Sequence, residues 1–457
     1  MNYEESVQSL LALGRELAAP RQPALSNAPG ATVQKFGLHN IRILSEALGN
    51  PHLAIPCAHI AGTNGKGSTA AMLESILRIA GLRTGLYTSP HLERINERIR
   101  IDSNEISDEA FASAWTQVHT AIESLIASGK LASHPTFFEC VTAIAFLAFA
   151  RQGVDFCVYE VGLGGRLDST NIVQPEIAVI TPIDFDHENF LGHSIEEIAG
   201  EKAGIIKPEV SVVSAIQRPE VLDVIRRRAG EVGAHLTEVE AVWKIEESAP
   251  AQNGRYRAVA SSRSLNATIE LAPSLRGAFQ IQNALTAATA VRLLAERGYQ
   301  ISDSAIERGI ATAQWPGRLE QLSVHPAIFL DGAHNPAAAR ELRRFWDDTF
   351  SDRRIFLVYG AMRDKAVDEI AGLLFPRAEC VILTAPRQSR AISASLLAEM
   401  TAPLARKAVV VADPTEALEQ ALSMATSDDV VFVTGSLFLV GDLRQYWKSR
   451  LSSQHLG

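Results

Sequence analysis

Residues 59–69 of this 457-residue chain run His59-Ile60-Ala61-Gly62-Thr63-Asn64-Gly65-Lys66-Gly67-Ser68-Thr69. An apolar run, residues 54–61, leads into this stretch, and residues 68–80 carry apolar side chains at helical spacing. Glycines between a strand and a helix let backbone N–H groups face a phosphate, the helix N-terminus adds positive potential, and a lysine reaches the terminal phosphates. The stretch therefore predicts a nucleotide-binding loop formed by Gly62, Thr63, Asn64, Gly65, Lys66, Gly67 and Ser68.

The loop departs from the usual pattern at two positions. Ile60 stands where the first glycine is expected, and Gly67 follows the lysine where a serine or threonine is usual. A magnesium ion at this loop would then need an oxygen ligand from elsewhere. Ser89, at the end of the next predicted strand (84–88), is a candidate, and an ordinary Ser-Pro turn is the alternative for that tetrapeptide.

Strand-like and helix-like segments alternate through most of the chain. The expected strands of the first part are 54–61, 84–88, 154–161, 177–182 and 210–215, and such alternation predicts a mainly parallel, doubly wound sheet. Residues 236–271 alternate differently and predict antiparallel ribbons, followed by a helix at 280–296. After the break at Trp315-Pro316-Gly317, strands are expected at 328–330, 355–359, 381–384, 408–411 and 430–434.

The fold class predicted from these patterns is α/β, in two domains. Residues 1–313 form a nucleotide-binding domain with a mainly parallel sheet, and residues 314–457 form a smaller, Rossmann-like α/β domain.

Composition narrows the functional classes. The net charge of −9 argues against a general nucleic-acid binder. The four cysteines form no CxxC pair, which argues against a cysteine zinc site or a disulfide framework. The start MNYEESVQSL does not resemble a signal peptide, and the longest apolar stretch, residues 140–150, is too short to span a bilayer. We therefore expect a cytoplasmic chain with no membrane or nucleic-acid partner.

Further polar residues follow the predicted strands. Glu160 ends the strand at 154–161, where ligands collect in open α/β sheets, and a partly buried structural carboxylate is the alternative. His187 lies among carboxylates at the end of the next strand, where a neutral imidazole could join a metal site. Composition alone makes Lys202 a solvated helix lysine and makes residues 136–139 the start of an amphipathic helix.

Eight segments together resemble the folylpolyglutamate synthase/dihydrofolate synthase family, within the Mur ligase superfamily. They occur in family order: GTNGKGST at 62–69, TSPH at 88–91, EVGLGGRLDSTN at 160–171, DHENFLG at 186–192, EKAGIIK at 201–207, LRGAFQIQNA at 275–284, WPGRLE at 315–320 and DGAHNP at 331–336. Gly67 is informative because the folate branch has glycine there, whereas peptidoglycan-building Mur ligases usually have serine or threonine. Phe279 departs from the family's common histidine, so its role stays open.

The resemblance implies roles for individual residues. ATP would be bound by the loop together with Asn283 at the adenine, Arg318 at the phosphates and Asp331, and Mg²⁺ by Ser89, Glu160 and His187. The residues implied in catalysis are Lys66, Lys202 as a carbamylated lysine, and His334 near the incoming amino acid. The substrate residues are Thr136, Phe137 and Phe138 beside the pterin, Arg166, Asp168, and Ser436 at the glutamate pocket.

The implied reaction is ATP-driven amide formation. A carboxylate takes the γ-phosphoryl group to become an acyl phosphate, and the amine of L-glutamate then displaces phosphate. The expected substrates are dihydropteroate and folates, in one bifunctional, monomeric enzyme. The alternatives are a peptidoglycan-type Mur ligase acting on a UDP-linked sugar and a nucleotide-binding module without ligase activity. Gly67 and the EVGLGGR loop argue against the first, and the separate second domain argues against the other.

Overall fold

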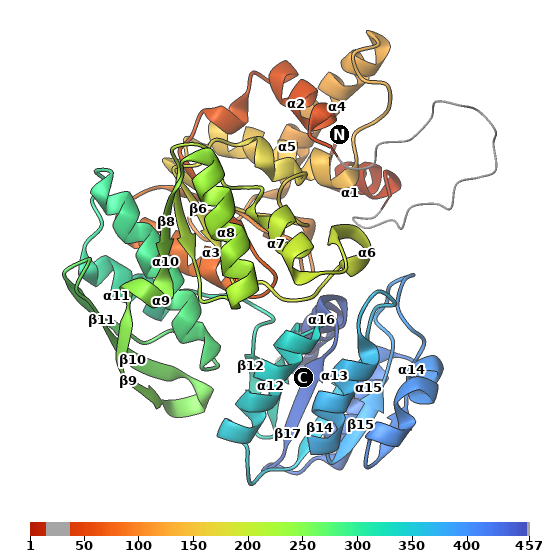
Figure 1. Ribbon diagram of the computed structural model, residues 1–457. Coiled ribbons are helices and arrows are strands. Elements are labelled where there is room, and N and C mark those ends of the chain that lie inside the picture. The colour runs from red at the N-terminus through yellow and green to blue at the C-terminus, as the bar shows by residue number, and fades with distance from the viewer. Residues whose placement is uncertain (15–36, 455–457) are drawn as a thin grey trace.

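The computed structural model describes residues 1–14 and 37–454. Two α/β bodies, each built around its own sheet, stand against each other, and a small three-stranded sheet lies beside the first (Figure 1). The fold is therefore α/β with a large, mainly parallel sheet and a second, C-terminal α/β domain, as the sequence predicts.

The first sheet has eight strands in the order β4-β3-β2-β5-β1-β6-β7-β8. All neighbouring pairs from β2 to β8 are parallel, and β3 and β4 add an antiparallel edge. The strand bounds are β1 (Cys57–Ala61), β2 (Thr84–Tyr87), β3 (Ile99–Ile101), β4 (Asn104–Glu105), β5 (Phe156–Glu160), β6 (Ile177–Ile180), β7 (Ser211–Ser214) and β8 (His235–Glu238). The five strands expected here are confirmed, with shorter bounds.

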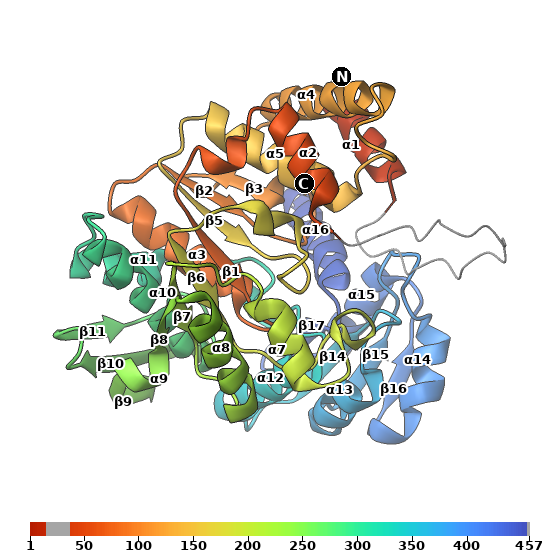
Figure 2. The ribbon, with the colours of Figure 1, turned by 45° about the horizontal axis from the view of Figure 1, so that its top comes forward.

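Helices cover both faces of this sheet (Figure 2). On one face α3 packs against α10 and α11, and on the other α5 packs against α2 and α4. The bounds of the helices around this sheet are α1 (Tyr3–Ala12), α2 (His39–Ala47), α3 (Lys66–Ile79), α4 (Asp108–Ala127), α5 (Phe137–Arg151), α6 (Glu188–Leu191), α7 (Ile195–Ala203), α8 (Pro219–Val232), α9 (Val239–Val242), α10 (Phe279–Glu296) and α11 (Asp303–Thr312). The apolar stretch at 140–150 is the buried body of α5, and no helix among the described residues could cross a membrane.

The expected antiparallel ribbons begin later than residue 236. Residues 236–238 belong to β8, which pairs in parallel with β7, so that part of the prediction is wrong. The alternation of polar and apolar residues there reflects a strand at the sheet edge rather than a ribbon. The ribbons themselves are β9 (Lys244–Pro250), β10 (Tyr256–Ser262) and β11 (Ala267–Leu271), in the order β11-β10-β9.

The second sheet has six strands in the order β12-β13-β17-β14-β15-β16. Its bounds are β12 (Glu320–Val324), β13 (Ala327–Leu330), β14 (Ile355–Tyr359), β15 (Cys380–Leu383), β16 (Ala408–Val410) and β17 (Val430–Thr434). The helices around it are α12 (Pro336–Thr349), α13 (Val367–Leu374), α14 (Ala394–Thr401), α15 (Pro414–Met424) and α16 (Leu437–Gln454). The sequence predicts its five parallel strands, whereas β12, which pairs antiparallel with β13, was not expected.

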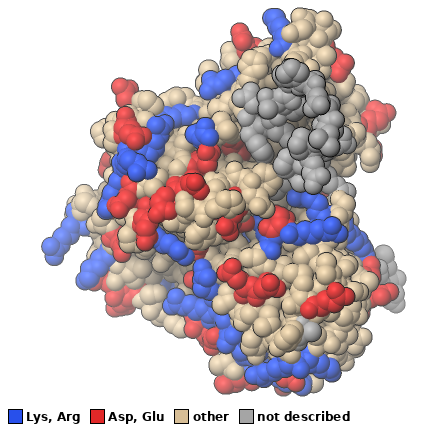
Figure 3. Space-filling view, turned by 45° about the vertical axis from the view of Figure 1, so that its right-hand side comes forward, with Lys and Arg blue, Asp and Glu red and all other residues tan. Residues whose placement is uncertain are grey.

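Acidic and basic side chains are interspersed over the face in Figure 3. The net charge therefore does not describe the local field at any one site. All four cysteines are buried and free, which confirms that Cys57, Cys140 and Cys157 are core residues.

Candidate active site

The loop predicted to bind phosphate lies between β1 and α3, the strand-to-helix position that the sequence indicates. Gly65 has a positive φ of 83° and precedes the first residue of α3. Gly62 has φ 148°, and a Cβ there would lie 1.9 Å from Thr181 Oγ1, so only glycine fits. The backbone N–H groups of Thr63 and Asn64 donate to the carbonyl oxygen of Pro182, at 2.9 and 3.1 Å. The loop is thus tied to the end of β6, the neighbouring strand.

The buried Lys202 and the partly buried Lys66 both point at the carbonyl groups of this loop. Lys66 Nζ donates to the carbonyl oxygens of Gly62 and Thr63, at 3.1 and 3.2 Å, and Lys202 Nζ donates to that of Gly62 at 2.8 Å. Burial lowers the pKa of Lys66. Burial, reinforced by the Lys66 charge, lowers the pKa of Lys202 to about 7. Lys202 is therefore not the solvated lysine that its composition suggests.

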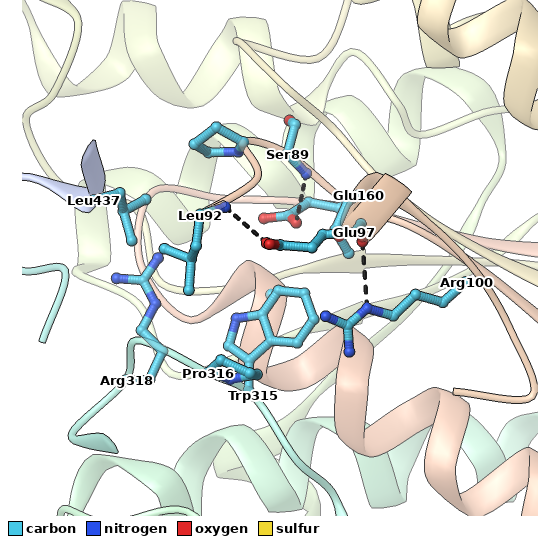
Figure 4. Close-up of a pocket in the computed structure, with 12 residues that line it drawn as sticks. Ser89, Leu92, Glu97, Arg100, Glu160, Trp315, Pro316, Arg318 and Leu437 are labelled. Atoms are coloured by element: carbon cyan, nitrogen blue, oxygen red, sulfur yellow. Dashed lines mark hydrogen bonds between the residues drawn. The ribbon is translucent and has the colours of Figure 1, made fainter. Parts of the chain in front are cut away.

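A pocket lies between the end of β2, the end of β5 and the linker that precedes β12 (Figure 4). Four of the predicted site residues line it: Gly67, Ser89, Glu160 and Arg318. The backbone N–H of Ser89 donates to Glu160 Oε2 at 3.3 Å, and burial raises the pKa of Glu160 to about 7. Residues from both domains thus share one cavity.

A second cluster joins the two domains at the end of β6. Asp186 accepts from Lys365 Nζ at 2.6 Å, and His334 Nε2 lies 3.5 Å from its other oxygen. Burial raises the pKa of Asp186, but the hydrogen bond from His334 and the Lys365 charge outweigh it and hold that pKa well below its usual range. The cluster therefore keeps the Asp186 carboxylate ionised between the Lys365 ammonium and the His334 ring.

His187 lies in this second cluster. Its Nδ1 is 4.0 Å from Asp364 and its Nε2 is 3.5 Å from Lys365 Nζ. Burial, with the Lys365 charge, lowers the pKa of His187 to about 3, so the imidazole is neutral. Ser89 and Glu160, by contrast, line the pocket, so the three predicted metal ligands are divided between two clusters.

The buried Glu160 carboxylate and the adjacent Ser89 suit Mg²⁺, which prefers oxygen ligands and keeps several waters. No group of three or more histidine, cysteine, aspartate or glutamate side chains that could hold a metal ion occurs in the described part of the chain. These residues would consequently need the nucleotide phosphates and water to complete a magnesium shell.

The other residues predicted to bind the nucleotide lie at the loop and at the linker before β12. Asn283 Oδ1 would lie 2.5 Å from a Cβ on Gly65, so the amide covers the loop, and Asn283 donates to Gln280 Oε1. The Ser68 hydroxyl is buried, with Gln280 Nε2 3.5 Å away. Asp331 accepts from the N–H groups of Leu319 and Ala333, both at 2.9 Å. Asp331 therefore fixes the linker that carries Arg318.

The predicted substrate residues have mainly structural contacts in this conformation. Thr136 caps α5, Phe137 is buried beneath the Arg98 guanidinium, and Phe138 lies against Gly162. Asp168 accepts from the N–H groups of Gly162, Leu163 and Thr170, which shapes the glycine loop after β5. Arg166 is exposed and paired with Glu201 at 2.7 Å, and Ser436 accepts from the N–H of Phe438.

Sequence reasoning missed several residues at these clusters. Lys365 and Asp364 come from the loop after β14, and Arg100 and the Trp315 indole line the pocket. Asp364 and Lys365 lie in the loop that follows the predicted strand 355–359, and the rule that selected Glu160 could have drawn attention to that loop. Arg100 gave no signal, since it belongs to none of the motifs and to none of the expected strands.

Comparison with known proteins supports the resemblance. Residues 60–291 match the Mur ligase middle domain, and residues 317–437 match the Mur ligase glutamate ligase domain. The dihydrofolate synthase/folylpolyglutamate synthase of Bacillus subtilis is 38% identical over 421 residues, covering 91% of this chain and 95% of that protein. The chain belongs to the dihydrofolate synthase/folylpolyglutamate synthase family of Mur ligases.

Other members of this family agree in sequence and structure. The Escherichia coli dihydrofolate synthase/folylpolyglutamate synthase is 33% identical, covering 94% of this chain and 95% of its own length. The Mycobacterium tuberculosis folylpolyglutamate synthase, solved with ADP and AMPPCP, superposes with a TM-score of 0.84 at 31% identity, over 90% of this chain and 95% of that one. Escherichia coli FolC in complex with DHPP and ADP gives a TM-score of 0.84 at 29% identity, over 98% of each chain.

Proposed function

We propose that this chain is an ADP-forming ligase that joins L-glutamate to dihydropteroate, to reduced folates, or to both. The observation that carries the proposal is the pocket in which Gly67, Glu160 and Arg318 meet, because it brings the nucleotide loop and the second domain to one place. Family members whose structures contain ADP, AMPPCP or DHPP support nucleotide and pterin substrates for this fold. The peptidoglycan and non-ligase alternatives have no comparable support.

Phosphoryl transfer depends on positioning and on charge neutralisation. In the proposed reaction the loop N–H groups and Lys66 hold the nucleotide phosphates, and Lys66 exchanges its carbonyl contacts for phosphate oxygens. Arg318 reaches the transferred group from the linker side of the pocket. Mg²⁺, held by Glu160 and Ser89, would neutralise phosphate charge when bound.

We assign the amino-acid side of the reaction to the second cluster. His334 Nδ1 donates to the carbonyl oxygen of Gly332 at 2.7 Å, because that oxygen only accepts, and this bond fixes the ring. Lys365 offers a cation to the incoming glutamate, which is anionic. The pKa of Lys202 near 7 leaves a large neutral fraction of its amine at or above that pH, and carbamylation requires the neutral amine.

The domain division is part of the proposal. We place it at residues 313/314, between the end of α11 and the linker. Action as a cytoplasmic monomer also stays a prediction.

The test measures phosphate release from ATP with dihydropteroate, tetrahydrofolate or a UDP-sugar, each with and without L-glutamate. We expect release that requires a pterin substrate and glutamate together, and transfer of ¹⁸O from the substrate carboxylate to phosphate. Lys66→Met should abolish release, whereas Lys244→Met, at a lysine whose side chain is 76% exposed, should not. Release that requires a UDP-sugar, or no co-substrate, would refute the proposal.

A further inference from the structure

The indole of Trp315 lies directly on the phosphate-binding loop. A Cβ added to Gly67 would be 2.6 Å from Trp315 Nε1 and 2.8 Å from both Cε2 and Cζ2. Any side chain at residue 67 would thus collide with the ring. The serine or threonine that usually follows the lysine and binds the metal through its hydroxyl is a glycine here, and this glycine contacts the linker between the domains.

A cation supports the indole from the edge of the first sheet. The Arg100 guanidinium carbon lies 5.6 Å from the centre of the Trp315 ring, within the range of a cation–π interaction. Arg100 Nε also donates to the carbonyl oxygen of Glu97 at 3.3 Å, which restrains the arginine. Figure 4 shows the indole between the side chains of Arg100 and Arg318. The ring is therefore held by both β3 and the first turn of α3.

The chain after the indole is also tightly fixed. Gly317 has φ 73°, and its N–H donates to Glu320 Oε2 at 2.8 Å. The Leu319 N–H donates to Asp331, as described above. Arg318 lies between these two anchored residues. Because Gly317 and Leu319 are tied to Glu320 and Asp331, residues 317–319 move as one unit with the second domain, and the contact between the indole and Gly67 sets where Arg318 lies in the pocket.

We propose that Trp315 is a positioning residue for the phosphoryl-transfer step, with Arg100 as its support. The indole seats the linker on the nucleotide loop and so places Arg318 against the transferred phosphoryl group. This inference rests on the proposed ligase function. It extends that function, because it assigns the coupling between the domains to one aromatic contact.

Tryptophan fluorescence tests the contact without any ligase reaction. AMPPCP with Mg²⁺ is titrated into the wild-type protein and into the Trp315→Phe and Trp447→Phe variants. Trp447 is a matched control because it also stacks with an arginine, Arg450 at 5.3 Å, and lies outside the pocket. We expect a change in emission that disappears in Trp315→Phe and persists in Trp447→Phe. A change of equal size in Trp315→Phe would overturn the contact.

Steady-state kinetics test the positioning. A misplacement of about 1 Å can reduce turnover about 100-fold, so Trp315→Ala should lower kcat by about that factor with KM for ATP nearly unchanged. Trp315→Phe should recover most of the loss. An equal loss in kcat and in nucleotide affinity, or no recovery by phenylalanine, would overturn the proposal.

A double-mutant cycle tests whether residue 67 and the Trp315 indole affect turnover through their mutual contact. Gly67→Ala should depress kcat strongly in the wild type, because the new methyl group strikes the indole, but only slightly in Trp315→Ala. Equal effects in both backgrounds would refute the coupling. If Trp315→Ala does not fold, the same cycle is run between Gly67→Ala and Trp315→Phe.

Arg100→Gln tests the support, with the exposed Arg83→Gln as its control. We expect reduced kcat and a shifted Trp315 emission only in Arg100→Gln, and wild-type behaviour there would remove Arg100 from the proposal.

A preparation that binds AMPPCP with the expected emission change but lacks ligase activity would refute the proposed function and leave the contact established.

Discussion

Replacing Asp331 by alanine tests how the linker is held. The buried carboxylate accepts two backbone hydrogen bonds, from Leu319 and Ala333, both at 2.9 Å. Bonds to a charged group contribute about 1.5–3 kcal/mol each. Burial of the carboxylate opposes this gain, as the raised pKa of Asp331 shows. We therefore expect a net loss of about 2–4 kcal/mol in the free energy of unfolding of the second domain.

Urea denaturation combined with amide hydrogen exchange measures this loss and locates it. The Leu319 and Ala333 amides should exchange much faster in Asp331→Ala, because both lose their acceptor. The matched control is Asp347→Asn, whose side chain is 47% exposed and paired with Arg343, and which should cost at most about 1 kcal/mol. Unchanged exchange at both amides, or a loss below 1 kcal/mol, would refute the structural role of Asp331.

Three further perturbations have expected outcomes. The pKa of Lys202 falls from 10.5 in the unfolded chain to about 7 in the folded one, so the unfolded chain binds more protons between these two pH values and the free energy of unfolding rises with pH there. Urea unfolding at pH 7 and pH 9 should show that Lys202→Met lacks this rise and is more stable than the wild type at pH 7. Gly317→Pro removes the N–H donated to Glu320 and forbids the φ of 73°, which should misplace Arg318, so turnover should fall far more than ATP affinity; unchanged turnover would mean that the conformation of the linker does not matter for catalysis. Arg444→Met removes the cation that Glu93 and Glu320 share, although Glu93 keeps Lys448 at 2.8 Å, so the loss in thermal unfolding should be about 2 kcal/mol, whereas a neutral effect would mean that solvent screens the network.

The sequence predicted an element correctly wherever a single local pattern specifies that element. The Gly62–Ser68 loop, the parallel strands of both sheets and the break at Trp315 all follow from glycine positions, apolar runs and turn residues. The prediction of antiparallel ribbons failed at residues 236–238, because alternating polar and apolar residues fit both a ribbon and an edge strand of a parallel sheet. Residues 236–238 resembled a ribbon because an edge strand such as β8 is also half-exposed.

For the candidate site, some of the residues predicted to act together do share one pocket and others do not. Glu160, Ser89 and Arg318 do meet in one pocket, and their positions after strands or at the linker gave the signal. His187 lies in the other cluster, beside Lys365. Lys365 lies 178 residues after His187 in the sequence. The residues around either position do not specify how the two domains pack against each other.

By itself the sequence determined the α/β class, the glycine-rich loop between β1 and α3, and the family, because short motifs constrain backbone geometry locally. Only the tertiary structure decided which side chains share a cavity. It placed the Trp315 indole on Gly67, buried Lys202 until its pKa falls to about 7, and paired Asp186 with Lys365 across the domain boundary. The physical reason is that burial, desolvation and charge pairing depend on distances between segments far apart in the chain, which periodicity and composition do not specify.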